Sequence, residues 1–456
     1  MSRSPTITPS QERAATTGTG ALDYSSPELL RLEKERLWPK IWQMACREEE
    51  IPHVGDFVNY KIFGESILVT RTGEHRIQAF YNVCQHRGRR LREDEKGHAT
   101  SWYCRFHGWK YDLDGANSYV HDQEDWAECP LRPGDIRLKE VKVGTWAGWV
   151  WINQDPNAIS LKEYLGEVPS YIDPFEWENG RVSWHETIIA PVNWKVIVEA
   201  FIENYHVFAT HTGGWQIPRG HSRGVVHGRH GMFYSQRNRV ADNSKPMRFQ
   251  DPDTGEWMTP TSAAEAVWAY NRHIYKRLAS LTAEPMMAAA ERLRAETPAD
   301  FPPEKLPLRL MELHKEELAK RGVQWPARLD REAIERAGTD WHVFPNSILL
   351  PSADSVLWYR LRPYGDDPER CIFDIWSIAR YAPGKEPKVE RHETVGFDAF
   401  RGRNPFLEED FANIEAVHEG MKSRGYEGPR FNPVQEPHLA NFHRVLKSYC
   451  FEDGTV

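Results

Sequence analysis

Cys84-Gln85-His86-Arg87-Gly88 and Cys104-Arg105-Phe106-His107-Gly108-Trp109 are the two segments that decide the fold of the N-terminal part of this chain. Each pairs one cysteine with one histidine in a short stretch that contains glycine, and residues 87–103 separate the two pairs. Thiolates and neutral imidazoles bind metals, so two loops with this spacing can bring four ligands together. The sequence therefore predicts a metal centre held by Cys84, His86, Cys104 and His107.

Two kinds of metal centre use two cysteines and two histidines. One is a structural zinc site, but a C-x-H pair is unusual in zinc fingers, and residues 87–103 do not resemble a finger helix. The other is a Rieske [2Fe–2S] cluster, in which the thiolates hold one iron and the imidazoles hold the other. Arg87, Trp109 and Tyr111 flank the loops, and aromatic neighbours would shield such a cluster. The pattern favours the Rieske centre.

Short β-branched and aromatic segments surround these loops from Ile51 to Pro156, with Gly and Asp between them, which is typical of strands. Residues 27–45 instead carry apolar residues at helical spacing, interrupted near Pro39. We therefore expect four parts. They are a disordered tail over 1–21, helices over 22–45, an all-β Rieske domain over 46–156, and a larger domain of mixed strands and helices over 157–456.

Composition excludes several classes of protein. The net charge of −8 argues against nucleic-acid and anionic-membrane partners. The first twenty residues contain no apolar run of a signal peptide, and no stretch approaches the roughly 18 apolar residues of a membrane span. Six cysteines are too few for a disulfide-stapled secreted scaffold, whereas 18 tryptophans indicate large buried aromatic surfaces. We expect a cytoplasmic protein.

A second group of potential ligands, Glu203, His206 and His211, lies in an apolar stretch with helical character. Glu203 and His206 are three residues apart, which makes them neighbours on one helix face. An ideal helix separates His206 and His211 by about 140°. Both can bind one metal only if the helix ends, or contains a π-bulge, between them.

Two histidines and one carboxylate form the facial triad of non-heme Fe(II) oxygenases, which leaves positions open for O2. The carboxylate would come from the distant run Glu408, Glu409 and Asp410, at the start of a helical pattern over 406–424. Spacing alone does not choose among the three, and a solvated helix start is the alternative interpretation of such a run.

Together these motifs resemble the α subunit of Rieske non-heme iron ring-hydroxylating oxygenases. The resemblance spans nearly the whole chain. It rests on CQHRG, CRFHGW, NWK, ENYHVFATH and LEEDFAN, at residues 84–88, 104–109, 193–195, 203–211 and 407–413. It implies an α+β fold, with an all-β Rieske domain followed by a helix-grip (START/Bet v1-like) catalytic domain with an antiparallel sheet. It also implies one [2Fe–2S] cluster on the four Cys/His ligands, and one mononuclear Fe(II) on His206, His211 and Asp410.

One position departs from the family pattern. The family commonly has an aspartate three residues before the first iron histidine, where it links the iron site to a Rieske histidine of the neighbouring subunit in a ring-shaped trimer. Glu203 occupies that position here. Because a longer carboxylate can do the same work, we expect Glu203 to be the intersubunit electron-transfer bridge. Its alternative role is to orient His206 alone.

The resemblance implies a terminal oxygenase that uses O2 and electrons from NAD(P)H to hydroxylate an aromatic substrate, most simply by ring dihydroxylation. No G-x-G-x-x-G or flavin-binding segment appears in the sequence, so the electrons would come through a separate reductase or ferredoxin. A homotrimer is expected, with or without a small β subunit. The alternatives are a Rieske monooxygenase or demethylase acting on an aromatic or other small molecule, and an electron-transfer Rieske protein without catalysis.

Candidate pocket residues lie near the iron motifs, or on strands expected to line the cavity, and plain core packing is the alternative for each. They are Phe201, Phe208, Phe344, Asn346, Ile348, Trp358 and Phe406. Phe406 is favoured because it lies one helical turn before Asp410. No arginine or lysine can be assigned to a substrate carboxylate from the sequence.

Overall fold

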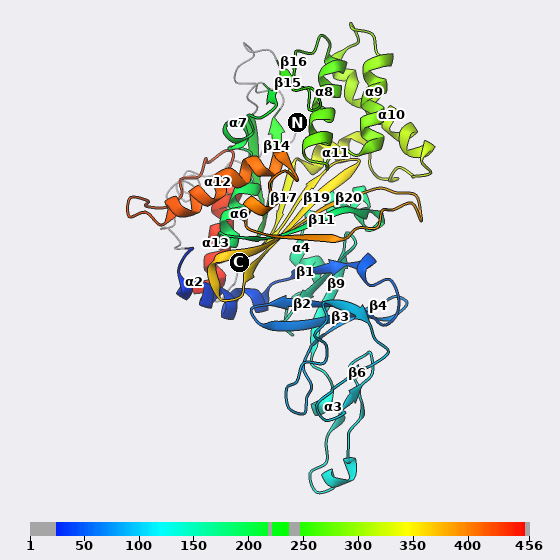
Figure 1. The fold of residues 1–456 in the computed structure, drawn as a ribbon, viewed down its shortest axis with the longest axis vertical. Coiled ribbons are helices and arrows are strands. Elements are labelled where there is room, and N and C mark those ends of the chain that lie inside the picture. Colours follow the sequence, from blue (N-terminus) through cyan, green and yellow to red (C-terminus); the bar gives the residue numbers. More distant parts are fainter. Residues whose placement is uncertain (1–23, 218–220, 237–246, 452–456) are drawn as a thin grey trace. The chain divides into compact units, whose positions relative to one another are not determined.

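The computed structural model describes residues 24–217, 221–236 and 247–451, so the tail expected over 1–21 lies outside the described residues. Figure 1 shows the path of the chain, which forms two compact units. One unit spans Leu32–Tyr164, and the other combines Met1–Arg31 with Leu165–Val456. The sequence predicts this boundary at residue 156. The segment after it stays with the smaller unit because Trp42 Nε1 donates to Ile159 O at 3.0 Å.

The smaller unit is built from antiparallel strands, as the sequence predicts for a Rieske domain. Its main sheet has seven strands in the order β1-β10-β9-β4-β3-β2-β5, and a separate sheet has the order β6-β7-β8. The strands are β1 (Gln43–Arg47), β2 (Asp56–Ile62), β3 (Glu65–Gly73), β4 (Arg76–Tyr81), β5 (Lys96–His98), β6 (Trp102–Tyr103), β7 (Lys110–Tyr111), β8 (Asn117–Tyr119), β9 (Glu140–Trp146) and β10 (Trp149–Asn153).

The helices expected over 22–45 end earlier than predicted. The described part of this segment is helical to Lys40, and β1 begins at Gln43. Every residue of β1 is buried, and all but Ala45 pair with β10, so sheet pairing overrides the local helical pattern. The helical elements of this region and of the smaller unit are α2 (Pro27–Leu32), η1 (Glu33–Leu37), η2 (Trp38–Lys40), η3 (Glu48–Glu50), η4 (Gln123–Trp126), α3 (Pro133–Ile136) and α4 (Leu161–Leu165).

An eight-stranded sheet forms the centre of the larger unit, in the order β13-β14-β17-β18-β19-β20-β11-β21. Neighbouring strands are antiparallel except β11 and β21. The strands of this unit are β11 (Arg181–Ala190), β12 (Trp215–Gln216), β13 (His221–His227), β14 (His230–Gln236), β15 (Arg248–Gln250), β16 (Trp257–Met258), β17 (Asp340–Val343), β18 (Ser347–Pro351), β19 (Ser355–Tyr364), β20 (Asp367–Ala379) and β21 (Arg391–Val395).

Helices pack on this sheet as expected for a helix-grip domain. Helix α6 lies against β19 and β20, α13 against β13 and β14, and α12 against α6, while α9 packs against both α8 and α10 (Figure 1). The helices are α5 (Val168–Ile172), η5 (Asp173–Phe175), η6 (Trp177–Asn179), α6 (Trp194–Phe201), α7 (Val207–Thr210), α8 (Ala263–Arg277), α9 (Glu284–Glu296), η7 (Pro303–Lys305), α10 (Leu306–Lys320), α11 (Arg331–Ala337), η8 (Asp398–Phe400), α12 (Pro405–Met421) and α13 (Pro437–Phe451).

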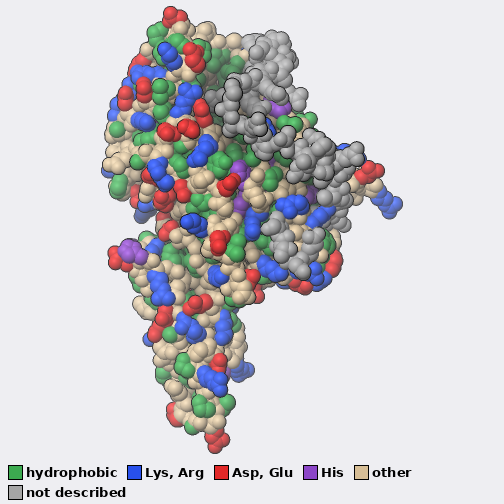
Figure 2. Space-filling model, turned by 180° about the vertical axis from the view of Figure 1, so that it is seen from behind, with side chains coloured by type: hydrophobic (Ala, Val, Ile, Leu, Met, Phe, Trp, Pro, Cys, Tyr) green, Lys and Arg blue, Asp and Glu red, His purple; other side chains and the backbone are tan. Residues whose placement is uncertain are grey.

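Helix α13 was not expected from the sequence pattern, which ended at residue 424. Its buried face includes His438, Asn441 and His443 beside leucines and aromatic residues, so polar and apolar residues do not separate along it. Among the described residues, no helix combines the length and the apolar character that crossing a membrane requires. On the face shown in Figure 2, the described acidic and basic side chains are interspersed, unlike the basic stripe of a nucleic-acid surface.

Side-chain alternation tells which face of the sheet α6 covers. Phe201 on α6 packs against Tyr359 and Phe373, with ring centroids 4.9 and 5.6 Å apart. Successive strand residues point to opposite faces. Trp358 and Arg360 therefore point away from α6, where Arg360 pairs with the buried Asp374 at 2.8 Å.

Asn193 begins α6 and ties it to two other segments. Its side chain accepts a hydrogen bond from Lys195 N at 3.0 Å, as an N-cap does. Its Nδ2 donates to Tyr24 O at 2.9 Å and to Pro368 O at 2.6 Å, and the residue is almost fully buried. The helix that leads to Glu203 and His206 thus depends on a single amide at its start.

We expect Asn193→Ala to lower the free energy of unfolding of the larger unit by about 2–3 kcal/mol, because a cap is lost and one buried and one partly buried carbonyl lose their donor. Ser262→Ala is the matched control, since Ser262 caps α8 through one bond to Glu265 N, and it should cost about 1 kcal/mol. Differential scanning calorimetry measures both. Equal effects would show that the two bonds made by Nδ2 contribute little.

Candidate metal centres and active site

The two Cys/His loops of the smaller unit share one backbone design. Gly88 N donates to Cys84 O at 3.0 Å, and Gly108 N donates to Cys104 O at 2.9 Å. The two glycines have φ values of 76° and 78°, a left-handed conformation that residues with a Cβ rarely adopt. Each loop therefore needs its glycine to turn the ligand residues toward the same point.

The four predicted ligands come together, with the cysteines inside and the histidines nearer the surface. Cys84 and Cys104 are buried, whereas His86 and His107 are partly exposed, with ring centroids 4.6 Å apart. The Nδ1 atoms of both histidines are buried and have no hydrogen-bond partner in the described structure. Two thiols and two free imidazole nitrogens are the donor set of a Rieske [2Fe–2S] cluster, so the residues fit that group.

Aromatic side chains enclose the loops. Trp109 stacks on His86 with ring centroids 4.9 Å apart and an interplanar angle of 7°. The Tyr111 hydroxyl lies 3.3 Å from Cys84 Sγ and accepts a hydrogen bond from Gln85 N at 3.0 Å. Burial raises the pKa of the Cys84 thiol, so a bound cation is needed to favour the thiolate there.

The geometric conflict between His206 and His211 is resolved because the helix ends before both. Helix α6 ends at Phe201, and the short helix α7 (Val207–Thr210) lies between the two histidines. Glu203 is in the connecting segment, so it and His206 meet through a turn rather than on one helix face. The sequence required a helix end or a π-bulge between the two histidines. The long helix α6 already ends before both, and it is the short helix α7 that ends between them, at Thr210.

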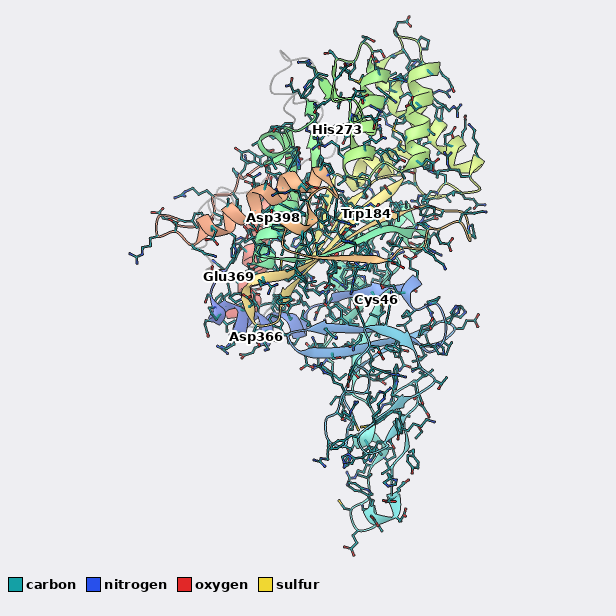
Figure 3. All side chains as sticks on the ribbon, in the orientation of Figure 1. Cys46, Trp184, His273, Asp366, Glu369 and Asp398 are labelled. Carbon is teal, nitrogen blue, oxygen red and sulfur yellow. The ribbon has the colours of Figure 1, made fainter. Side chains whose placement is uncertain are left out.

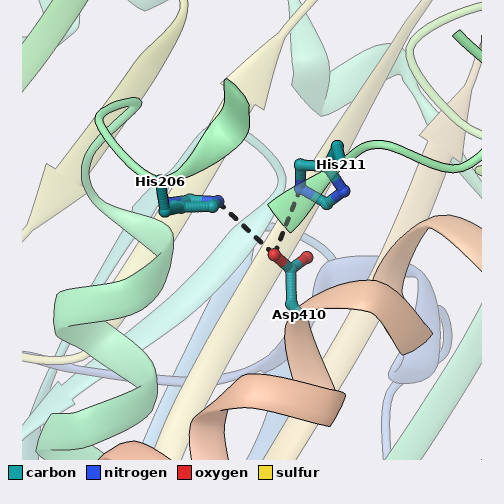
Figure 4. Close-up of side chains that lie close together, drawn as sticks. All are labelled: His206, His211 and Asp410. Atoms are coloured by element: carbon teal, nitrogen blue, oxygen red, sulfur yellow. Dashed lines mark ion pairs between the residues drawn. The ribbon is translucent and has the colours of Figure 1, made fainter. Parts of the chain in front are cut away.

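Asp410 on α12 faces the two histidines, as Figure 4 shows. Its Oδ1 lies 3.4 Å from His206 Nε2 and 3.1 Å from His211 Nε2. One ligand atom from each residue lies within 4.8 Å of the others. This donor set fits the two-histidine, one-carboxylate site of non-heme iron enzymes, in which three protein ligands leave further positions open.

Charges at this site depend strongly on one another. Burial alone would lower the pKa of His206, but hydrogen bonds with Asp410 and Glu203 outweigh it and raise that pKa to about 10. The pKa of His211 is raised through Asp410 and Glu409, again against the effect of burial. Burial would raise the pKa of Asp410, yet its bonds to both histidines lower it. The carboxylate therefore favours positive charge at the point where the three side chains meet.

Each histidine has a carboxylate behind it. Glu203 Oε1 lies 2.5 Å from His206 Nδ1, and its other oxygen accepts hydrogen bonds from Tyr205 N and His206 N. Glu409 Oε2 lies 2.9 Å from His211 Nδ1. Sequence reasoning placed Glu203 here. The sequence did not predict Glu409 as a partner of His211, because the spacing of the acidic run at 408–410 does not tell which of its carboxylates lies near a histidine.

The predicted pocket residues occupy different places. Phe406 stacks on His211, with ring centroids 4.0 Å apart and an interplanar angle of 15°. Phe201 and Ile348 lie on the side of the sheet that α6 covers, since Ile348 pairs with Tyr359 across the strands. Phe208 is half-buried on α7.

The other candidates are held in the sheet and its core. Asn346 is fully buried and donates to Leu361 O at 2.5 Å. Phe344 packs against Phe442 and Tyr449, and Trp358, on the face away from α6, donates to Ser347 Oγ at 2.8 Å. Phe344 and Trp358 therefore serve the core, the alternative that the sequence left open.

Comparisons with known proteins identify the family. The description "Ring hydroxylating alpha subunit (catalytic domain)" matches residues 176–452, more than half of the chain, and "Rieske [2Fe-2S] domain" matches residues 41–130. The glycine betaine monooxygenase oxygenase subunit of Pseudomonas aeruginosa (strain UCBPP-PA14) is 32% identical over 188 residues, which is 41% of this chain and 43% of the relative.

A second relative and a solved structure point the same way. Biphenyl 2,3-dioxygenase subunit alpha of Rhodococcus jostii (strain RHA1) is 33% identical over 200 residues, 42% of this chain and 43% of the relative. The alignments thus span less than half of these relatives. The quaternary ammonium Rieske monooxygenase CntA, solved with L-carnitine, has the same fold, with a TM-score of 0.61, 19% identity and coverage of 96% of this chain and 97% of that one.

The resemblance inferred from the sequence is thereby confirmed, together with its α+β fold and its two cofactors, a Rieske [2Fe–2S] cluster and a mononuclear iron typical of the family. The likeness covers both units and both groups of ligands. The chain belongs to the ring-hydroxylating α subunits of the Rieske non-heme iron oxygenases.

Proposed function

We propose that this chain is a terminal oxygenase that hydroxylates an aromatic substrate, most simply by ring dihydroxylation, with O2 and electrons from NAD(P)H. The observation that carries the proposal is the convergence of His206, His211 and Asp410 in a chain that also holds the Cys/His loops. A pure electron carrier would have no use for that triad. The aromatic substrate is supported by Phe406, which stacks on His211, and by Phe201 beside the sheet.

In this proposal, Cys84, His86, Cys104 and His107 hold the cluster, and His206, His211 and Asp410 hold Fe(II). When bound, the cluster supplies single electrons and the iron supplies a site where O2 is activated. The protein positions the substrate and excludes water. Phe201, Phe208, Asn346, Ile348 and Phe406 stay predictions as lining residues. We expect a cytoplasmic homotrimer, with or without a small β subunit, that receives electrons from a separate reductase or ferredoxin.

Glu203 is proposed as the bridge that carries electrons from a Rieske histidine of a neighbouring subunit. Its contact with His206 Nδ1 at 2.5 Å places it directly behind one iron ligand. It forms no ion pair with a lysine or arginine among the described residues, so its charge stays available for a histidine from outside the chain. The carboxylate is longer than the family's usual aspartate, which extends its reach by one methylene.

Replacing Asp410 or His206 by alanine should abolish product formation while leaving the Rieske spectrum intact. Either change removes one of three ligands of the mononuclear site, yet none of the four cluster ligands. Product is measured by mass spectrometry with a generic reductase, and mononuclear iron by metal analysis against acid-labile sulfide. Unchanged turnover would rule out this site as the place of reaction.

Glu203→Gln should slow electron transfer between subunits by about tenfold or more with both metal centres still occupied, since the amide keeps its size but not its charge. Rapid-mixing single-turnover experiments, starting from the reduced cluster, measure this rate. The matched control is Glu408→Gln, in the acidic run of α12, because that side chain accepts hydrogen bonds from Gly402 N and Asn404 N. A wild-type rate of electron transfer in Glu203→Gln would rule out Glu203 as the bridge.

A second candidate function, oxidation of a substrate that carries a quaternary ammonium group, is favoured by Asp340. This residue is 2% exposed, and its Oδ1 has no hydrogen-bond partner among the described residues. Burial and the charge of Glu203 raise its pKa well above the usual range. Without a cation the carboxyl group avoids the cost of a buried charge by staying protonated, and a cationic ligand would favour its ionised form.

The sheet register places Asp340 on the side where α6 lies. His342 pairs with Ile348 and Ile348 with Tyr359, so these three share a face, and Asp340 shares it because it lies two residues from His342. Tyr359 in turn contacts Phe201 of α6. The glycine betaine monooxygenase subunit matched above is named for a substrate of this class.

A panel of biphenyl, anthranilate, glycine betaine and carnitine separates the two candidates, with product mass spectrometry as the readout. If the substrate is cationic, Asp340→Asn should lower kcat/KM for it by roughly 100-fold, the cost of removing one partner of a buried charge pair. Asp398→Asn is the control, because that side chain is 91% exposed. Turnover of aromatic compounds alone, unaffected by Asp340→Asn, would exclude the second candidate.

A further inference from the structure

Glu409 and Arg277 form a largely buried pair that contacts one iron histidine and has no counterpart at the other among the described residues. Arg277 Nη2 donates to Glu409 Oε1 at 2.7 Å, while Glu409 Oε2 lies 2.9 Å from His211 Nδ1. The side chains of Glu409 and Arg277 are 19% and 18% exposed. One carboxylate thus connects a metal ligand on its inner side with a fixed guanidinium on its outer side.

The backbone beside His211 leaves room for this pair. A Cβ on Gly213 would overlap Glu409 Oε1, and a Cβ on Gly214 would lie 2.7 Å from Arg277 Nη1. Gly214 also has a φ of 86°, which favours glycine. Two consecutive glycines, which begin two residues after His211, therefore permit the close approach of Glu409 and Arg277.

Helix α8, which carries Arg277, is joined to the His211 segment by a second contact. His273, labelled in Figure 3, lies one helical turn before Arg277 and stacks on Trp215, with ring centroids 4.8 Å apart. Trp215 Nε1 donates to His211 O at 2.5 Å. The guanidinium is therefore held in a fixed position relative to the histidine that it influences.

The two iron histidines consequently differ in the charge behind them. Arg277 compensates the charge of Glu409, whereas no lysine or arginine among the described residues compensates Glu203. Glu409 is held between His211 and the guanidinium of Arg277, whereas Glu203, in the described part of the chain, contacts only the His206 ring and the backbone N–H groups of Tyr205 and His206. An uncompensated carboxylate can still accept a donor from another chain.

We propose that Glu409, held by Arg277, is the positioning residue for His211, and that it acts on metal binding alone. This inference rests on the proposed iron site, and it separates the work of the two carboxylates. Glu409 keeps the Nδ1 proton of His211, so that the Nε2 lone pair faces the metal. Glu203 is left to serve the neighbouring subunit.

The test is the affinity of the metal-depleted protein, with its Rieske cluster retained, for Fe(II), measured anaerobically by competition with a chelator. Glu409→Ala should weaken binding by roughly 10- to 100-fold, the usual effect of losing such a partner. Arg277→Met should weaken it less, because the carboxylate remains but is no longer fixed. Glu408→Gln is the matched control on the same helix and should bind as the wild type does.

A second measurement distinguishes positioning from a general structural role. With full iron occupancy, and with the mononuclear iron first oxidised to Fe(III) so that it can accept the electron from the reduced cluster, Glu409→Ala should show the wild-type rate of intersubunit electron transfer per bound iron, whereas Glu203→Gln should stay slow. The near-infrared spectrum of bound Co(II) should also change in Glu409→Ala and not in Glu408→Gln. Wild-type Fe(II) affinity in Glu409→Ala, or a slow transfer rate at full iron occupancy, would overturn the proposal. Neither measurement needs a substrate, so failure of the aromatic assignment would not affect the result.

Discussion

The buried carboxylate of Asp410 is the group on which the rest of the catalytic unit depends. It is 5% exposed, and burying a carboxylate without partners costs several kcal/mol. Its partners, His206 and His211, lie about two hundred residues earlier in the chain. Helix α12 must therefore pack against the α6 region before the Asp410 carboxylate can contact the two histidines. Aromatic contacts supply that packing, since Phe411 contacts Phe373 of the sheet and stacks on Phe397.

The position of the histidines depends in turn on how α6 ends. The carbonyl groups in the last turn of a helix lack intrahelical partners. Just after α6, Ile202 O accepts a hydrogen bond from the His438 ring of α13. Gly231 lies against that ring, where a Cβ would overlap His438. The chain can therefore leave the helix at Phe201 and bring two residues, five apart, to one point. Helix α13, which the sequence pattern did not predict, thus stabilises the end of α6 that lets His206 and His211 converge.

The sequence predicted what depends on local spacing. The loops at Cys84 and Cys104 were found because a cysteine, a histidine and a glycine recur in each, and the need for a helix end or a π-bulge between His206 and His211 followed from helical geometry. The choice of Asp410 over its neighbours came only from the resemblance, since adjacent helix positions differ by about 100° and their targets lie elsewhere in the fold. The Arg277–Glu409 pair and β1 escaped prediction for the same reason, because both are set by tertiary contacts.

The charges around the iron ligands add up in a way that suits a divalent cation. Glu203, Asp410 and Glu409 contribute three negative charges and Arg277 one positive charge, which leaves two negative charges. Before metal binding, raised pKa values let His206 and His211 take up protons against those charges. Fe(II) carries two positive charges, as the two protons do together, and it binds the two imidazoles only in their neutral form. Metal and protons therefore compete for one electrostatic site, and Arg277 is the residue that adjusts the total from three negative charges to two.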